Sequence, residues 1–317
     1  MANIIPTPSS IDPLSEGEVR VERVGPRLQR MALGMLLAGQ PSPNDPAVDP
    51  FLSFAHDQKL DLTDLWAVWR NDVLVGACLI VPSPGRTAML FVSPAKQPDP
   101  DPALVRVIQA ALAAQNPSHV QMVQCLLNLE QTPEAHALTD AGLTSLATLF
   151  YMSRPTLRTA TPLTLDPDIE VVQWSESHRP RFADAILKSY EDTRDCPGLL
   201  GLRTLDDIMA GHMATGTFDP TLWWALHQHD QPVGVMLLSK LSHQNAGELV
   251  YLGLAPAFRG RGLSRTLLQH GMGVLGERKI ARILLAVDRD NEPAIGLYRS
   301  LRFTVTHQKA AFIFTLK

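Results

Sequence analysis

The two halves of the 317-residue chain carry similar blocks of sequence in the same order. The first-half blocks are LWAVWRNDVLVGACLI (65–80), GRTAMLFVSPA (85–95) and VQCLLNLEQTPEAHALTDAGL (123–143). They resemble LWWALHQHDQPVGVMLL (222–238), GELVYLGLAPA (247–257) and ILLAVDRDNEPAIGLYRSLRF (283–303). A shared spacing of about 160 residues in all three pairs is typical of an internal duplication. The sequence therefore predicts one structural unit that occurs twice.

Apolar periodicity and turn residues predict the same elements in each half. In the first half we expect helices and strands in alternation, namely a helix at 26–38, two strands within 65–81 turning at 70–72, a strand at 87–93, a helix at 102–114, a strand at 120–129 and a helix at 133–142. This order is typical of an α/β fold whose mixed sheet has helices on both faces. We predict two tandem domains, 1–155 and 165–317, joined by a Thr- and Pro-rich linker around 154–168.

Composition excludes several classes of protein. A net charge of −4 gives no strong field towards nucleic acid or anionic membranes, and no apolar run reaches the ~18 residues of a transmembrane helix. Three widely spaced cysteines fit no disulfide framework and no CxxC zinc site, and they favour a reducing compartment. The first residues show no signal-peptide pattern. We expect a cytoplasmic monomer or homodimer without metal, nucleic-acid or membrane partners.

The segment with the clearest chemistry lies between Pro256 and Thr266, where an apolar strand ends, a loop RGRGLS follows and an amphipathic helix begins. A helix N-terminus presents free N–H groups and partial positive charge. Gly260 and Gly262 add no Cβ that would keep a bulky anion away, and Arg259 and Arg261 bring positive charge. The loop is neither a Walker loop nor a complete G-x-G-x-x-G motif. The residues alone favour a pyrophosphate cradle and a plain glycine turn about equally.

Two motifs in the second half resemble those of the GNAT N-acetyltransferase superfamily. The run Leu252–Ser264, LGLAPAFRGRGLS, is similar to the family's V/L-x-x-P-x-x-R-G-x-G-x-G/A motif. The run Asn291–Phe303, NEPAIGLYRSLRF, is similar to its Asn-x-x-A-x-x-L-Y-x-x-L-G-F motif, with Arg302 in place of the usual glycine. The clear resemblance covers about residues 247–303, and a weaker one reaches back to about 168. A tandem chain with one active unit resembles the mycothiol-synthase-like branch, whose acceptor is a small amine.

The resemblance implies acetyl-CoA as the donor substrate. It implies that main-chain N–H groups of Arg261, Gly262, Leu263 and Ser264 hold the pyrophosphate, with Arg259 and Gly260 shaping the loop. It further implies that Leu252 and Leu254 present strand backbone to the pantetheine arm, that Asn291 bonds near that arm, and that Tyr298 lies close to the sulfur.

Acetyl transfer by direct attack on a thioester requires a base that deprotonates the amine, and the leaving thiolate benefits from an acid. Glu248, on the strand before the cradle, is the candidate base, and the Tyr298 phenol is the candidate acid. The plainer interpretations are a solvated strand-edge carboxylate for Glu248, a half-buried helix aromatic for Tyr298 and a helix N-cap for Asn291.

The first half lacks these groups when the blocks are aligned. Gln97-Pro98-Asp99-Pro100 replaces the Arg259–Gly262 segment, Arg86 stands opposite Glu248, and Leu138 stands opposite Tyr298. Prolines remove N–H donors and an aspartate repels phosphate. We therefore predict that the first domain is a degenerate GNAT-like unit that does not bind CoA productively.

The predicted function is transfer of acetyl from acetyl-CoA to a primary amine of a small molecule. The alternatives are a non-catalytic CoA-binding or sensory module and a protein or peptide N-acetyltransferase. We give little weight to His227 and His229 as metal ligands, because no third ligand is evident. Cys196 is expected to be non-catalytic, and the acidic stretch 191–195 is expected to be a solvated loop rather than an amine-binding one.

Overall fold

The computed structural model describes residues 18–96, 98–241 and 244–316. The N-terminal residues expected to lack a signal peptide, and Gln97 of the first-half loop, therefore lie outside the described residues. Among the described residues, none of the helices is both long and apolar enough to cross a membrane.

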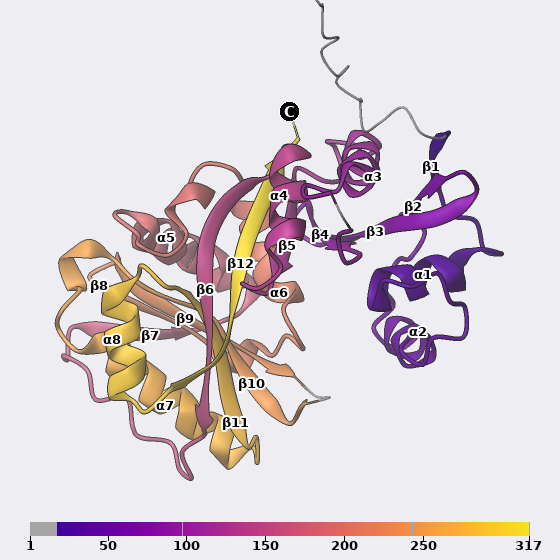
Figure 1. Cartoon of the computed structure of the whole chain (residues 1–317). Coiled ribbons are helices and arrows are strands. Elements are labelled where there is room, and N and C mark those ends of the chain that lie inside the picture. Colours follow the sequence, from indigo (N-terminus) through magenta and orange to yellow (C-terminus); the bar gives the residue numbers. More distant parts are fainter. Residues whose placement is uncertain (1–17, 97, 242–243, 317) are drawn as a thin grey trace, which may run out of the picture. The chain divides into compact units, whose positions relative to one another are not determined.

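The two halves contain the same elements in the same order (Figure 1). The elements of the first half are β1 (Val19–Arg23), α1 (Gln29–Ala38), α2 (Val48–Asp57), β2 (Leu65–Arg70), β3 (Val73–Ser83), β4 (Thr87–Val92), α3 (Pro102–Ala113), β5 (Met122–Leu127), α4 (Thr132–Asp140) and β6 (Thr144–Pro155). Those of the second half are β7 (Ile169–Gln173), α5 (Arg179–Tyr190), α6 (Leu205–Ala214), β8 (Trp223–Gln228), β9 (Gln231–Leu241), β10 (Ala246–Leu254), α7 (Leu263–Glu277), β11 (Arg282–Asp288), α8 (Glu292–Ser300) and β12 (Thr304–Thr315). The α/β fold with a repeated unit is confirmed; the short strands β1 and β7 were missing from the prediction.

The two repeats exchange their last strands. β6, from the first repeat, pairs with β11 of the second, and β12 pairs with β5 of the first, while β6 and β12 also pair with each other. Figure 1 shows these two long strands side by side. The registers repeat as well, because Val287 faces Phe150 just as Leu127 faces Ala310. The duplication seen in the sequence is therefore present in the hydrogen bonding of the sheet.

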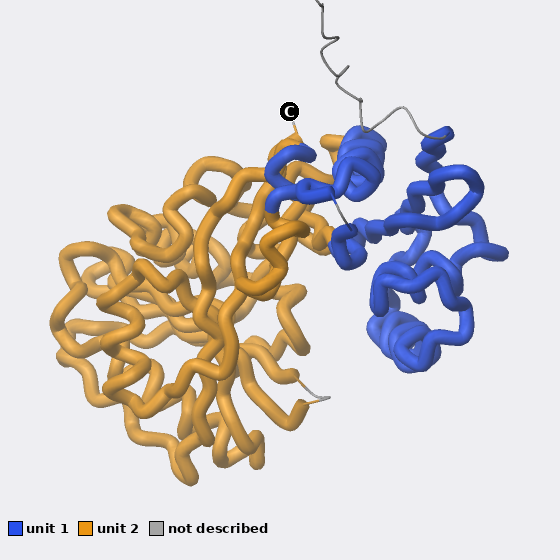
Figure 2. The backbone as a smooth tube through the Cα atoms, in the orientation of Figure 1, with its two compact units in different colours: residues 1–81, 91–114, 136–141 blue, residues 82–90, 115–135, 142–317 orange. Residues whose placement is uncertain are grey.

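The chain divides into two compact units that cut across the repeats (Figure 2). Unit 1 comprises residues 1–81, 91–114 and 136–141, and unit 2 comprises 82–90, 115–135 and 142–317. Unit 2 thus contains β5, β6 and the start of β4 from the first repeat, because the exchanged strands bind these segments to the second-repeat sheet. The strand order in unit 2 is β4-β5-β12-β6-β11-β10-β9-β8-β7. The domain boundaries 1–155 and 165–317 describe sequence repeats and stay a prediction.

The strand registers correct one alignment made from the sequence. In the parallel pairs β4–β5 and β10–β11, Met89 occupies the position of Glu248, since Met89 faces Gln124 and Glu248 faces Leu284. Arg86 corresponds instead to Asn245, and both have positive φ, 50° and 45°. A bulge in β10, between Leu249 and Tyr251, inserts one residue and so accounts for part of this misplacement of Arg86.

An aromatic cluster in unit 2 fixes α5 against the sheet. Trp174 meets Phe182 of α5 edge-on, with ring centroids 5.0 Å apart, and meets Trp223 of β8 at 5.1 Å. Phe182 and Trp223 are almost completely buried, and such aromatic pairs add stabilisation beyond the area that they bury. The cluster holds the first turn of α5 against the sheet, and the other end of the helix, at Ser189, lines the site described below.

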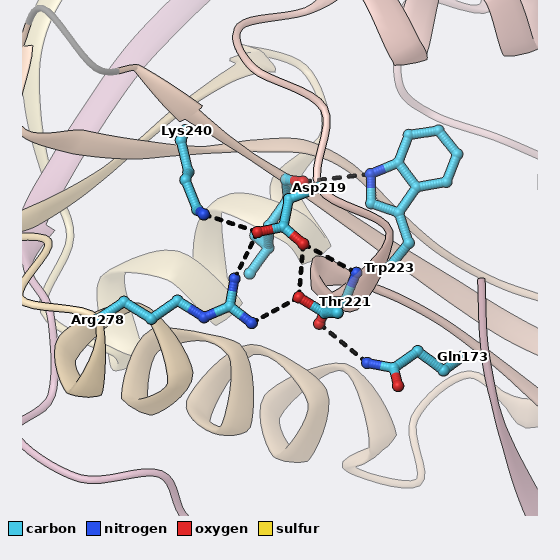
Figure 3. Close-up of polar contacts among 7 residues, drawn as sticks. Gln173, Asp219, Thr221, Trp223, Lys240 and Arg278 are labelled. Atoms are coloured by element: carbon cyan, nitrogen blue, oxygen red, sulfur yellow. Dashed lines mark hydrogen bonds and ion pairs between the residues drawn. The ribbon is translucent and has the colours of Figure 1, made fainter. Parts of the chain in front are cut away.

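A partly buried ion-pair network joins three elements of the second repeat (Figure 3). Asp219, just before the short 3-10 turn η3 (Pro220–Leu222), accepts from Lys240 of β9 at 2.7 Å and from Arg278, at the end of α7, at 2.8 Å. It also accepts the Thr221 hydroxyl at 2.5 Å, while Arg278 donates to that hydroxyl at 2.6 Å. The network fixes the C-terminal end of α7 and so the direction in which its N-terminus points.

The predicted linker lies along α7. β6 ends only at Pro155, and the following segment has no regular structure but runs close to the helix. A Cβ on Gly276 would come within 1.6 Å of the Leu157 carbonyl oxygen, so only glycine permits this approach. The Ala160 amide donates to the Glu277 carboxylate at 2.9 Å. The linker therefore supports α7 from the side.

Candidate active site

The candidate site is a cleft of about 670 Å³ that opens where β10 and β11 stop pairing. The two parallel strands pair only at Ala246–Glu248, opposite Arg282–Leu284. Beyond this point the β10 bulge diverts its strand, and the cleft is lined from Leu249 to Leu254 on one side and by Ala286 and Val287 on the other. A cleft of this volume accommodates a small-molecule ligand.

The N-terminus of α7 presents unused N–H groups at one end of this cleft. Gly262 is the N-cap residue, with φ 80° and no side-chain capping bond. Its carbonyl accepts the amides of Arg265 and Thr266. Among the described residues no acceptor is seen for the amides of Arg261, Gly262, Leu263 and Ser264. Free amides at the positive end of a helix, here one of 15 residues, are the arrangement that commonly binds phosphate groups in proteins.

The glycines keep this end of the cleft open. Gly260 has φ 76°, and Cβ atoms built on Gly260 or Gly262 would meet nothing within 4 Å. Gly260, Gly262 and Ser264 line the cleft, whereas Arg261 and Leu263 do not. The Arg261 guanidinium lies instead over the Phe258 ring, 5.1 Å from its centroid. The main chain, more than the Arg261 charge, forms the site.

Arg259 connects the loop to the opposite wall of the cleft. Its guanidinium donates to the carbonyl oxygens of Leu254 at 3.1 Å, Ser189 at 3.1 Å, Glu191 at 2.5 Å and Asp192 at 3.3 Å. These last three residues belong to the end of α5 and the loop after it. Arg259 therefore joins the loop to the end of α5 on the opposite wall.

Asn291 and Tyr298 lie on the far side of the cleft, on and beside α8. Asn291 caps α8 by accepting the Ala294 amide at 3.3 Å, as the plainer interpretation expected, and also lines the cleft. Tyr298 lines the cleft with only 7% of its surface exposed. Burial, followed by the nearby Asp195 charge, raises the pKa of the Tyr298 phenol well above its usual value, so the phenol remains a proton donor at neutral pH.

Glu248 does not line the cleft. It lies at the last paired position of β10, directly before the first cleft-lining residue Leu249, and faces Ser239 on β9 and Leu284 on β11. The side chain is half-buried, and burial raises the pKa of its carboxyl. Burial thus makes Glu248 a stronger base than a solvated carboxylate.

The acidic loop after α5 contributes a residue that the sequence analysis undervalued. Asp195 lines the cleft, and its carboxylate accepts the Asp288 amide at 3.2 Å and bonds with the Asn291 side chain. The Asp195 side chain is exposed to the open cleft on one side. Protein surrounds its other sides, and this burial raises the pKa of its carboxyl. The acidic run EDTRD was the feature of the sequence that could have pointed to Asp195. In contrast to Asp195, Cys196 has a thiol whose pKa burial raises to about 12, which makes it a poor nucleophile.

Aromatic residues complete the cleft wall next to this loop. Tyr251 lines the cleft, its hydroxyl lies 2.8 Å from that of Ser189, and its ring meets Tyr190 edge-on at 5.5 Å. Behind it, His212 of α6 stacks on the Tyr251 ring, with centroids 5.5 Å apart. Burial lowers the pKa of His212 to about 4, so this imidazole is neutral at pH 7.

Residues 183–303 match the family model described as Acetyltransferase (GNAT) family. The chain carries a GNAT domain. A mycothiol acetyltransferase of Beutenbergia cavernae is 36% identical over 107 residues, which is 33% of this chain and 35% of that protein. A peptidyl-lysine N-acetyltransferase of Escherichia coli is 38% identical over 85 residues, 27% of this chain and 50% of that protein. The matches to these two relatives thus span half or less of their length.

The GNAT fold extends over the whole chain. A GCN5-related N-acetyltransferase from Sphaerobacter thermophilus aligns over 94% of this chain and 95% of its own, with a TM-score of 0.61 and 18% identity. The likeness in fold therefore covers both repeats. In the GNAT motif the usual glycine is replaced by Arg302, which adopts φ 65°, a conformation that favours glycine; its equivalent in the first repeat is Gly142, with φ 102°.

In the first repeat, the amides at the equivalent helix N-terminus already have a side-chain acceptor. α3, the equivalent of α7, is capped by Asp101, whose carboxylate accepts the amides of Ala103 and Leu104 at 3.0 and 3.4 Å. A carboxylate at these amides competes with a phosphate for the same hydrogen bonds and repels its charge.

Proposed function

We propose that the protein is an acetyl-CoA-dependent N-acetyltransferase that moves an acetyl group to a primary amine of a small molecule by direct attack. The observation that carries the proposal is the set of unused amides at Arg261–Ser264, which opens into the cleft between β10 and β11. Acetyl-CoA supplies an activated thioester and a diphosphate suited to these amides. The wide, Cβ-free approach at Gly260 and Gly262 fits a group of that size.

The residues in and beside the cleft have complementary roles in this proposal. The α7 amides bind the diphosphate, and the backbone of Leu252 and Leu254, which no longer pairs with β11, offers hydrogen bonds to the amide-bearing arm. Glu248 accepts a proton from the attacking amine, directly or through water, and Tyr298 donates one to the departing thiolate. Asn291 holds Asp195 and the start of α8 in place.

The acceptor class rests on the comparisons with relatives. The resemblance to mycothiol acetyltransferases supports a small polar molecule with a primary amine, and the carboxylate of Asp195 at the cleft wall suits a cationic amine. The peptidyl-lysine relative favours a second candidate, transfer to a lysine side chain of a protein or peptide. Since acetyl-CoA is an intracellular metabolite, the proposed activity belongs in the cytoplasm.

Calorimetry with CoA, followed by an acceptor panel, tests the proposal. We expect CoA to bind at one site per chain, because α3 is self-capped. The panel consists of amino sugars, amino acids, polyamines and a lysine-containing peptide, with CoA thiol release measured by a chromogenic reagent. Turnover of the small amines supports the proposal, and turnover of the peptide alone supports the second candidate. CoA binding without turnover would indicate a sensory module, and no binding would refute all three.

A further inference from the structure

A bidentate ion pair joins the start of β4 to α6, a helix that lies behind the cleft wall. Arg86 donates from Nε to Oδ1 of Asp207 at 2.9 Å and from Nη2 to Oδ2 at 2.6 Å. The Asp207 residue is only 8% exposed. The two residues lie in the same compact unit, although Arg86 comes from the first sequence repeat. Two parallel bonds fix the carboxylate in orientation as well as in position.

The main chain around Arg86 is built for this contact. The Arg86 carbonyl accepts the Gln121 amide at 2.7 Å, which anchors the residue to the start of β5. The preceding Gly85 has φ 84°, and a Cβ there would come within 2.2 Å of the Asp207 carbonyl oxygen. The β3–β4 turn thus touches α6 with its backbone as well as with the guanidinium.

Asp207 controls how α6 begins. The helix starts with a capping box in which the Thr204 hydroxyl accepts the Asp207 amide at 3.2 Å and the Asp207 carboxylate accepts the Thr204 amide at 3.3 Å. The Thr204 hydroxyl also donates to this carboxylate at 2.6 Å. The same carboxylate therefore serves both the capping box and the ion pair. Its position sets where the first turn of α6 lies against the rest of unit 2.

The last turn of α6 supports the cleft. His212 stacks on Tyr251, and its Nε2 is buried without a hydrogen-bond partner among the described residues. Packing, and not hydrogen bonding at that atom, therefore holds the ring in place. Tyr251 in turn lines the cleft and contacts Ser189 and Tyr190 beside the loop that carries Asp195. A shift of α6 would move this wall directly.

We propose that Arg86 is a positioning residue for the acceptor side of the cleft, acting through Asp207, α6 and the His212–Tyr251 stack. This inference rests on the proposed acetyltransferase function. The inference assigns a role to the first repeat. That repeat supplies the cation, Arg86, that positions the acceptor wall of the cleft in the second repeat.

Kinetics of Arg86→Gln, Arg86→Lys and Arg181→Gln test this role. Arg181 forms an equally close bidentate pair with Glu170, at 2.9 and 2.6 Å, away from the cleft lining, and is the matched control. With the fastest amine of the panel, we expect Arg86→Gln to lower kcat/KM for the amine about tenfold. KM for acetyl-CoA and calorimetric CoA binding should not change, Arg86→Lys should recover part of the loss, and Arg181→Gln should behave as wild type.

A second readout needs no acceptor. His212 titrates near 4 because it is buried, so loosening of α6 by Arg86→Gln should raise its pKa in an NMR titration, while Arg181→Gln should not. Wild-type kinetics and an unchanged His212 pKa in folded Arg86→Gln would overturn the inference. If wild type turns over no amine, the proposed function fails, and the His212 titration alone decides whether Arg86 positions the wall.

Discussion

At the scale of single residues, burial shifts the pKa of both proposed catalytic groups in the same direction, and this shift suits a different role in each. It raises the pKa of both Glu248 and Tyr298. For the carboxyl group, a higher pKa means a stronger base; for the phenol, it means that the proton is retained until a strong base such as a thiolate appears. One physical cause thus prepares both a base and an acid.

Glu248→Gln should lower kcat by about 10²–10⁴-fold and leave CoA affinity unchanged, because Gln cannot accept the amine proton. In wild type, activity should fall as the pH drops through the raised pKa of Glu248. This fall should therefore begin at a pH above the ordinary Glu pKa of about 4.3. Steady-state kinetics between pH 5 and 9, with exposed Glu176→Gln as the control, check both. A variant with wild-type turnover would remove Glu248 from the mechanism.

Tyr298→Phe should reduce kcat about 10²-fold, since the leaving thiolate loses its proton donor while the buried ring remains. Calorimetric titration with CoA should give the wild-type dissociation constant, because the helix-end amides are untouched. A loss confined to CoA affinity would show that Tyr298 binds the donor and does not protonate the thiolate.

At the scale of elements, the site depends on a helix that starts without a side-chain cap. The motif RGRGLS predicted this start from sequence, since glycines and the strand-to-helix transition are local features. Asp195 could not be predicted in the same way. Its place in the cleft depends on contacts with Asp288 and Asn291, about 90 residues away in the chain.

Gly262→Ala should weaken CoA binding at least tenfold, because the residue has φ 80° and its new methyl group would enter the approach to the amides. Gly201→Ala is the control, since Gly201 has φ 75° and also open space around a Cβ, but lies outside the cleft lining. Equal losses of CoA affinity in the two variants would assign the effect to backbone strain alone.

The Asp219 network should stabilise the fold in a pH-dependent manner. Burial tends to raise the pKa of Asp219, but bonds from Lys240 and Thr221 and the Arg278 charge lower it further than burial raises it. A depressed folded pKa adds stability above the unfolded value of about 4 and loses it as pH falls towards the folded value. Asp219→Asn should therefore cost about 1–3 kcal/mol at pH 7 in urea unfolding.

The corresponding comparison is Asp206→Asn, which breaks an ion pair with Arg179 whose carboxylate is 88% exposed. Exposed pairs contribute little, so this variant should unfold close to wild type. Equal unfolding free energies for the Asp219 and Asp206 variants would contradict a stabilising role for the network.

At the scale of the whole molecule, the repeat was predictable but the strand exchange was not. The repeated blocks stop just before β6 and β12, and a strand has the same sequence pattern whether it pairs within its own repeat or across to the other. The exchange also explains why sequence repeats and compact units differ, and why residues such as Arg86 lie in the unit that contains the site.

A fragment of residues 165–317 lacks β6 and should fail to form a soluble folded protein, because β11 and β12 would each expose an unpaired edge. Co-expression with residues 1–155 should restore a folded complex with CoA affinity. Analytical gel filtration and circular dichroism of the fragment, alone and co-expressed, check this. A monodisperse, folded fragment would show that the exchange is dispensable.

The distance along the chain between β12 and its partner strands also constrains how the molecule folds. Thr304–Thr315 pairs with β5 and β6, yet about 150 residues separate its first residue from the end of β6 at Pro155. The first repeat must therefore wait, with β5 and β6 uncovered, through the synthesis of about 160 further residues. Such delayed long-range pairing slows folding and exposes strand edges to aggregation, so production in cells should depend on chaperones and on moderate expression rates.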